Sequence, residues 1–231
     1  MTLTRQVVDT TIRGITSLLC RIDDSQLVQV PAEGPLIIVA NHINFLDAPV
    51  VVTRLQPRAV TGFAKVETWD NPVMAFLFDT WEAIPVRRGA ADMTAFRNGV
   101  KALKSGKILA ISPEGTRSND GRLQKGHPGV TKFALLSGAP LLPVAYYGGE
   151  KYRQNLPRLR RTDFIIKVGK LFYLDEGGVR VNRQIRQQMT DEIMYQIAAL
   201  LPPFYRGEYA DLTNATQTYL RFPSESNNQK V

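Results

Sequence analysis

The 231-residue sequence contains a single cysteine, Cys20. One cysteine excludes an internal disulfide, and no Cys/His cluster has the spacing of a zinc site, so we expect no structural metal and a small apolar role for Cys20. The first 25 residues lack the continuous apolar core of a secretory signal. No stretch approaches the roughly 18 apolar residues of a transmembrane helix. The sequence therefore predicts a cytoplasmic protein.

Several functional signatures are also missing. No Gly-x-Ser-x-Gly elbow occurs, and Cys20 does not stand beside a glycine turn, so a nucleophile supplied by the protein is not indicated. The segment 99–108 is not a phosphate-binding loop, because Lys101 stands where glycine is required and Ile108 where Ser or Thr would bind magnesium. Neither a helix-turn-helix nor an aromatic RNA-binding signature is present, and we expect no nucleic-acid partner.

Charge is plentiful and predominantly positive, with 29 Lys and Arg against 21 Asp and Glu. A net charge of +8 favours anionic partners. Two interpretations remain open for the most basic region, which is either a solvated face or a surface that lies against an anionic membrane. Its basic residues are Lys151, Arg153, Arg158, Arg160, Arg161, Lys167, Lys170, Arg180, Arg183 and Arg186.

Length and a hydrophobic content of 44% are sufficient for one α/β domain. Apolar runs of strand length alternate with segments of helical periodicity, which predicts a mostly parallel or mixed central sheet flanked by helices. We expect an N-terminal amphipathic helix within residues 1–30, a main domain over 31–222 and a flexible tail over 223–231. Strands are expected near 36–40, 59–64, 83–86, 108–112, 141–146 and 164–168, and helices near 48–55, 71–80, 92–104, 128–136 and 181–201.

The N-terminal helix is expected to span residues 3–22, because its apolar residues recur at helical spacing with charged residues on the other side. Either packing on the core or anchoring in a bilayer interface fits this pattern. Its apolar residues are Leu3, Val7, Val8, Ile12, Ile15, Leu18, Leu19 and Ile22.

His42 follows the apolar strand 36–40 by two residues. Ligands of open α/β sheets bind at the carboxyl ends of strands, so this histidine is a candidate functional residue. Asp47 can reach it only if a turn intervenes, and Ala48-Pro49 is typical of a helix start that Asp47 would cap. One interpretation is a capping aspartate with a histidine bonded to backbone. The other is a dyad in which Asp47 fixes the tautomer of His42, and the two are compatible.

A second segment, Ser112-Pro113-Glu114-Gly115-Thr116-Arg117-Ser118, follows the apolar strand at 108–112. If the two strands are parallel, this segment lies at the same edge of the sheet as His42. Gly115 permits a tight turn, and Arg117 can hold a phosphate through paired hydrogen bonds. An ordinary turn with a surface ion pair is the alternative.

Together these segments resemble the glycerolipid acyltransferases, a family that includes 1-acylglycerol-3-phosphate acyltransferase and carries Asn-His-x4-Asp and Pro-Glu-Gly-Thr-Arg blocks. Both blocks match without gaps, and the resemblance spans roughly residues 35–150. Weaker blocks are similar to Ala83–Arg88, to Lys125-Gly126 and to Leu142-Pro143-Val144. The chain departs from the family at Glu82, where glycine is common, at Arg87 and at Ser112. These departures concern mainly the identity of the acceptor.

The resemblance implies an O-acyltransferase that moves a fatty acyl group from acyl-CoA or acyl carrier protein to a phosphate-bearing lysolipid, without a further cofactor. His42 and Asp47 would be catalytic. Arg88, Arg117 and Lys125 would bind the acceptor phosphate, Glu114 and Gly115 would shape that site, and Leu142-Pro143-Val144 would line the acyl tunnel. Such enzymes work as peripheral proteins on the inner face of the membrane. Another lysolipid or glycolipid acceptor, or a thioesterase using water at the same dyad, is the alternative. For four aromatic residues we expect core or membrane-facing packing rather than ligand contacts: Trp69, Phe76, Phe78 and Trp81.

Overall fold

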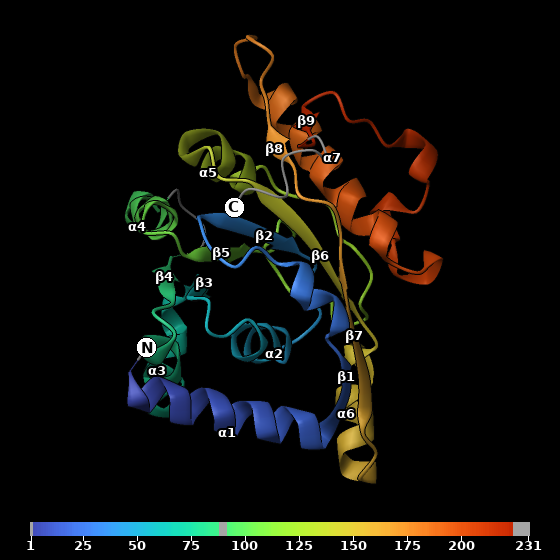
Figure 1. Cartoon of the computed structure of the whole chain (residues 1–231). Coiled ribbons are helices and arrows are strands. Elements are labelled where there is room, and N and C mark those ends of the chain that lie inside the picture. The colour runs from blue at the N-terminus through green and yellow to red at the C-terminus, as the bar shows by residue number, and fades with distance from the viewer. Residues whose placement is uncertain (1, 88–91, 224–231) are drawn as a thin grey trace.

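The computed structural model describes residues 2–87 and 92–223 and contains a mixed seven-stranded sheet in the order β1-β7-β6-β2-β5-β3-β4 (Figure 1). Within this sheet, neighbouring strands are parallel except for β6 and β7. A two-stranded ribbon, β8 with β9, lies apart from it. The strands are β1 (Cys20–Asp23), β2 (Leu36–Ala40), β3 (Val60–Lys65), β4 (Ile84–Val86), β5 (Ile108–Ile111), β6 (Leu141–Tyr147), β7 (Thr162–Val168), β8 (Tyr173–Leu174) and β9 (Leu220–Arg221).

Helices cover both faces of the sheet. The central strand β2 is buried throughout, and its side chains alternate between two cores as the pleat requires. Ile38 packs on the side of α1 and α2, whereas Ile37 and Val39 pack on the side of α4, α5 and α7 (Figure 1). The helices are α1 (Leu3–Leu19), α2 (Asp47–Arg54), α3 (Pro72–Thr80), α4 (Met93–Lys104), α5 (Gly129–Ser137), α6 (Tyr152–Asn155) and α7 (Arg183–Leu200).

The expected α/β class, with a mixed sheet and an N-terminal helix, is confirmed. The expected helix over residues 3–22 is wrong at its end, because α1 stops at Leu19 and the backbone becomes extended at Cys20. Residues 20–23 form β1, an edge strand that pairs in parallel with β7. Ile22 suits a strand as well as a helix, so its spacing did not separate the two. The N-terminal segment is therefore part of the sheet, and Cys20 packs in the core as expected.

The faces of α1 are reversed relative to a helix of an ordinary soluble domain. Arg5, Asp9 and Thr16 are buried against the protein, and Ile12 and Leu19 pack at the margin of the core. Four apolar side chains instead face outward: Leu3, Val7, Ile15 and Leu18. Of the described helices, none has the length and apolar character needed to cross a bilayer.

Candidate active site

The candidate histidine follows the carboxyl end of β2, where the chain leaves the sheet. Asn41 fixes this point, because its side-chain amide donates to the Tyr146 carbonyl at 2.9 Å and its Oδ1 accepts from the Tyr146 N–H at 2.8 Å. Both residues are buried. This two-bond clamp ties the end of β2 to β6 and sets the direction in which His42 leaves the strand.

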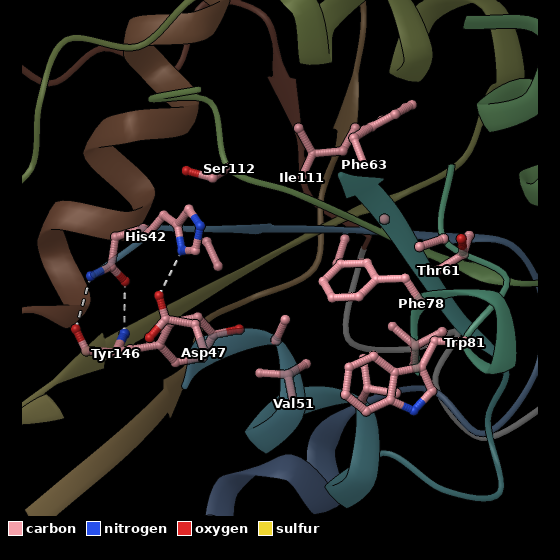
Figure 2. Close-up of a pocket in the computed structure, with 18 residues that line it drawn as sticks. His42, Asp47, Val51, Thr61, Phe63, Phe78, Trp81, Ile111, Ser112 and Tyr146 are labelled. Carbon is pink, nitrogen blue, oxygen red and sulfur yellow. Dashed lines mark hydrogen bonds and ion pairs between the residues drawn. The ribbon is translucent and has the colours of Figure 1, made fainter. Parts of the chain in front are cut away.

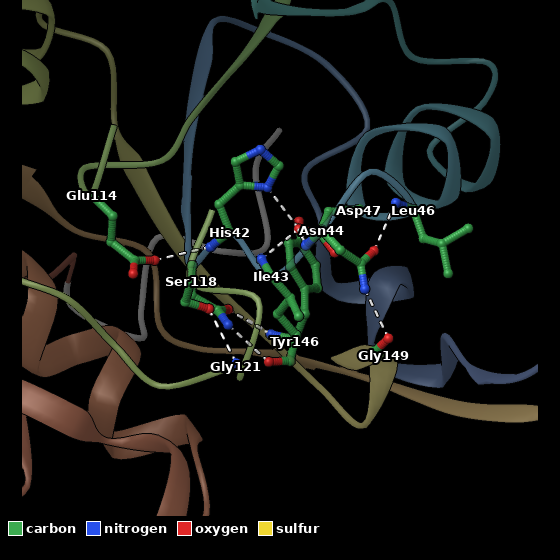
Figure 3. A network of polar contacts seen from close by, with 11 residues as sticks. His42, Ile43, Asn44, Leu46, Asp47, Glu114, Ser118, Gly121, Tyr146 and Gly149 are labelled. Atoms are coloured by element: carbon green, nitrogen blue, oxygen red, sulfur yellow. Dashed lines mark hydrogen bonds and ion pairs between the residues drawn. The ribbon is translucent and has the colours of Figure 1, made fainter. Parts of the chain in front are cut away.

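Residues 41–46 form the turn that brings His42 and Asp47 together (Figure 3). His42 Nδ1 lies 2.7 Å from Asp47 Oδ2. The same oxygen accepts the N–H groups of Ile43 at 2.7 Å and Asn44 at 3.1 Å. An oxygen that already accepts two bonds suits an Nδ1–H donor, which leaves the lone pair of the imidazole on Nε2. The dyad is thus built to present Nε2 as a base.

Asp47 does not cap α2 as the sequence suggested. The helix begins at Asp47 itself, and the N-cap position belongs to Leu46, which makes no side-chain capping bond. The Asp47 carboxylate is instead turned back to the N–H groups of the preceding turn and to the imidazole. Asn44 holds the other side of this turn, since its Oδ1 accepts from the Leu46 N–H and its amide donates to the Gly149 carbonyl.

The segment that follows β5 lies directly against the histidine turn. Glu114 is 2% exposed, and its two oxygens accept the backbone N–H groups of His42 and Gln124, each at 2.9 Å. The Ser118 N–H donates to the His42 carbonyl at 2.8 Å. Burial raises the pKa of the Glu114 carboxyl to about 7, against the opposing effect of those two hydrogen bonds. Glu114 therefore joins the two loops through backbone contacts.

Gly115 occupies the left-handed region with φ of +68°. A Cβ at this position would meet only a ring carbon of His127, at 3.6 Å. The turn therefore requires glycine for its backbone conformation rather than for space.

The expected phosphate-binding cations are only partly described. Arg117 is exposed and precedes Ser118, whose N–H bonds to the His42 carbonyl, so this arginine lies beside the dyad loop. Lys125 is also exposed, one residue beyond the Gln124 N–H that Glu114 holds. Arg88 falls outside the described residues. The binding role of all three stays a prediction.

An apolar cavity of about 170 Å³ opens beside the dyad (Figure 2). Strands β2, β3 and β5 and helices α2 and α3 contribute to its walls. Polar side chains are few, and His42 and Asp47 lie together among them. The lining residues are Ala40, Asn41, His42, Asp47, Ala48, Val51, Val52, Val60, Thr61, Gly62, Phe63, Phe78, Trp81, Ala83, Ala110, Ile111, Ser112 and Tyr146.

The expected acyl-binding block, Leu142-Pro143-Val144, lies elsewhere. These residues form the middle of β6, where they pair with β2, and Leu142 and Val144 are buried in the core. They do not belong to the lining of the cavity beside His42. Their apolar character reflects their place in a central strand.

Phe78 and Trp81 line the cavity. From the sequence we had expected these two residues to serve packing rather than ligand contacts. Trp81 is buried, and its indole N–H donates to Asp9 Oδ1 on α1 at 2.8 Å (Figure 2 shows the ring at the end of the cavity remote from His42). The Thr61 hydroxyl donates to the Glu82 carbonyl beside it. The only indication of this role in the sequence was the apolar character of the helix at 72–80. That character did not show which face of the helix turns toward the site.

Glu82 stands where the resemblance led us to expect glycine, and its backbone conformation is one that suits glycine. Its φ is +52°, a region that L-residues seldom adopt. The Glu82 carboxylate pairs with Lys107 and lies 3.7 Å from Arg5 Nη1.

Within the described residues, no group of three or more His, Cys, Asp or Glu side chains is arranged to hold a metal ion.

Comparison with known proteins gives consistent results. Residues 21–147 match the model of the Acyltransferase family. A 1-acyl-sn-glycerol-3-phosphate acyltransferase of Bacillus subtilis (strain 168) is 30% identical over 52% of this chain and 59% of its own length. A lyso-ornithine lipid O-acyltransferase of Pseudomonas aeruginosa is 28% identical over 67% of this chain and 61% of its own. The matched segment thus spans about three fifths of these two relatives.

The fold has a counterpart among solved structures. The 1-acyl-sn-glycerophosphate (LPA) acyltransferase of Thermotoga maritima superposes with a TM-score of 0.61, covering 85% of this chain and 79% of that one at 22% identity. The family match covers more than half of the sequence and includes His42, Asp47, Glu114 and Arg117. The chain therefore belongs to the Acyltransferase family, in agreement with its resemblance to the glycerolipid acyltransferases.

Proposed function

We propose that the protein is an O-acyltransferase that moves a fatty acyl group from an acyl thioester to the hydroxyl of a lysophospholipid-type acceptor. One observation carries the proposal: a histidine with Nδ1 bonded to a buried carboxylate at 2.7 Å stands at the polar end of an apolar cavity. A base next to an apolar cavity suits a reaction between a hydroxyl and the thioester of a fatty acid.

In the proposed reaction, His42 Nε2 removes the proton from the acceptor hydroxyl while its oxygen attacks the thioester carbonyl. Asp47 stabilises the imidazolium that forms and keeps Nδ1 protonated. Collapse of the tetrahedral intermediate breaks the carbon–sulfur bond. The imidazolium proton then passes to the leaving thiolate, so the histidine is neutral again. General-base catalysis of this kind contributes typically about 10²- to 10⁴-fold.

On the donor side, the acyl chain would lie in the cavity lined by Val51, Phe63, Phe78 and Trp81. This assignment replaces Leu142-Pro143-Val144 as the proposed acyl-binding region. Acyl-CoA and acyl carrier protein both present the thioester at the end of a long flexible arm, and either donor is compatible with a base at the edge of the sheet.

On the acceptor side, Arg117 and Lys125 would hold the anionic headgroup, together with Arg88. Relatives of this chain bear names that differ in the acceptor, a lysophosphatidate in one and a lyso-ornithine lipid in another. We propose the phosphate-bearing acceptor, because Arg117 is held beside the dyad by the Ser118–His42 backbone bond. A guanidinium forms two charge-assisted bonds to a phosphate. The enzyme would work as a peripheral protein at the inner face of the cell membrane.

A thioesterase is the second candidate, since water can replace the acceptor hydroxyl at the same dyad. The two candidates differ in one prediction, because a thioesterase would consume the thioester whether or not a lysolipid is present.

The decisive experiment incubates the purified protein with acyl-CoA or acyl carrier protein and a panel of acceptors. The panel contains 1-acylglycerol 3-phosphate, a lyso-ornithine lipid, glycerol 3-phosphate and a neutral monoacylglycerol, and mass spectrometry identifies the products. We expect acyl transfer to 1-acylglycerol 3-phosphate, and its loss in His42→Ala. Release of free fatty acid alone would favour the thioesterase, and unchanged transfer in His42→Ala would refute the mechanism.

A further inference from the structure

The segment 121–127 lies between the dyad loops and the C-terminal part of the chain. On its inner side, the Gln124 N–H donates to Glu114 Oε2 at 2.9 Å. The other oxygen of Glu114 accepts the His42 N–H, also at 2.9 Å (Figure 3). Lys125, which we expect to bind the acceptor, follows Gln124 directly. The inner side of this segment is therefore tied to the backbone of the histidine loop.

On its outer side, the same segment is bound by residues near the C-terminus. Leu123 donates its N–H to the Tyr205 carbonyl at 2.9 Å and accepts the Glu208 N–H at 3.1 Å. The Gly126 N–H donates to the Tyr209 hydroxyl at 3.1 Å. The segment is thus held from both sides, and the residues on its outer side contribute to the position of Gln124 and Lys125.

The outer partners belong to residues 203–209, which follow α7 and lie alongside it (Figure 1). The family match ends at residue 147, so it gives no role to this part of the chain. Tyr209 is 5% exposed, and its hydroxyl donates to Asp191 Oδ1 on α7 at 2.9 Å. Its ring packs edge-on against Tyr195, with 5.1 Å between the ring centroids. Both the ring and the hydroxyl of Tyr209 are therefore fixed by α7.

Gly126 is the point at which the segment 121–127 approaches α7 most closely. A Cβ at this position would lie 2.7 Å from Met194 Cγ, so the approach depends on glycine. Gln187 Nε2 donates to the Gly126 carbonyl at 3.1 Å and to Asp191 Oδ1 at 3.0 Å. The two backbone polar groups of Gly126 are thus bound by Gln187 and Tyr209, and both of these side chains share Asp191.

We propose that Tyr209 is a positioning residue for the acceptor site. By fixing Gly126, it would hold Lys125 toward the acceptor headgroup and Gln124 against Glu114. Of the described residues that line the acyl cavity, none belongs to 121–127 or 203–209, so the effect should fall on the acceptor and not on the donor. The inference deepens the proposed function and rests on it for the identity of the ligand, a phosphate-bearing lysolipid.

Steady-state kinetics of Tyr209→Phe test this role, because the variant removes the hydroxyl and keeps the ring. We expect the KM for 1-acylglycerol 3-phosphate to rise about 5- to 30-fold and kcat to fall less than about 3-fold. The KM for the acyl donor should change little. A displaced Lys125 weakens the ground state and the transition state alike, which raises KM more than it lowers kcat. Gln187→Leu removes the other Gly126 contact and should raise the same KM.

Thr216→Val is the matched control in the same part of the chain. The Thr216 hydroxyl donates to Glu192 Oε1 at 2.7 Å, so this change also removes one hydroxyl bond to α7 and leaves the Gly126 contacts in place. Urea denaturation would show its effect on stability, while its acceptor KM should equal that of the unaltered protein. An equal rise in KM for Thr216→Val, or an unchanged acceptor KM in Tyr209→Phe, would overturn the proposal.

Hydrogen exchange followed by mass spectrometry tests the positioning without any turnover. Exchange over residues 121–127 should be about 10-fold faster in Tyr209→Phe than in the unaltered protein, and exchange over residues 41–47 should also rise. Thr216→Val should match the unaltered protein in both segments. Equal exchange in all three proteins would overturn the proposal. The expected pattern in a protein that transfers no acyl group would refute the proposed function and leave the positioning by Tyr209 supported.

Discussion

Glu114 offers the sharpest test of the structure, because a buried carboxyl makes stability depend on pH. Burial raises its pKa from 4.5 in the unfolded chain to about 7 in the fold. A folded-state pKa above the unfolded value means that the folded protein binds the extra proton between these limits. The group's contribution to stability is complete below pH 4.5 and is lost as pH rises through 7. At about 1.4 kcal/mol per unit, the loss totals about 3 kcal/mol.

The measurement compares urea denaturation of the unaltered protein and Glu114→Gln between pH 5 and 8. The glutamine does not titrate, so the difference in free energy of unfolding isolates the carboxyl. Relative to Glu114→Gln, the unaltered protein should lose roughly 2 to 3 kcal/mol of free energy of unfolding between pH 5 and 7.5. Above that pH the difference should level off. The variant also leaves one of the two backbone N–H donors, on His42 or Gln124, without an acceptor, which adds an offset of about 1–3 kcal/mol independent of pH. A difference that stays constant from pH 5 to 8 would contradict the raised pKa.

Other substitutions probe the dyad, the acceptor side, the cavity and the backbone. His42→Ala and Asp47→Asn should each lower kcat for acyl transfer by about 10²- to 10⁴-fold, measured by product formation under saturating donor. Arg117→Ala should raise the KM for a phosphate-bearing acceptor by about 10- to 100-fold while the KM for the acyl donor changes little. Trp81→Leu lengthens the cavity and should shift kcat/KM toward longer acyl donors by about 10-fold in a competition assay. Gly207→Ala should lower the free energy of unfolding by more than about 2 kcal/mol, because its Cβ would lie 2.0 Å from the Leu123 carbonyl oxygen.

The dyad variants and the glycine variant have controls on the same chain. Unchanged urea midpoints are expected for the dyad variants, and a large shift would move their effect from chemistry to folding. Gly177 has a positive φ with open space around it, so Gly177→Ala should cost only the backbone strain of about 1 kcal/mol. Equal destabilisation at positions 177 and 207 would contradict the close approach. An unaltered chain-length preference in Trp81→Leu would remove Trp81 from the acyl-binding region.

The sequence predicted the site where local order in the chain decides it. The strand 36–40, the turn and the start of α2 are consecutive, so the sequence allowed His42 and Asp47 to meet if a turn intervened, and that turn is present. The parallel pairing of β2 with β5 then brought the Glu114 segment beside them, as expected. Contacts between residues that are distant in the sequence could not be predicted in this way. The pattern around Leu142 was the same for a cavity wall and for a central strand, and only the sheet order distinguishes them.

The same limit applies to α1. Its periodicity showed two faces, but hydrophobicity alone assigned the apolar one to either core or bilayer. Asp9 and Trp81 are 72 residues apart, and the bond between them decides which face turns inward.

Because of the Asp9–Trp81 bond, substitutions on the two faces of α1 have different effects. The inner face of α1 contacts Trp81, a residue that lines the cavity, so substitution of Asp9 would disturb that side of the cavity. The apolar side chains of the outer face are exposed, so they can vary with little effect on the packing of the core. Substitutions on the inner face of α1 would therefore affect the cavity, whereas substitutions on the outer face would affect the surface that the protein presents.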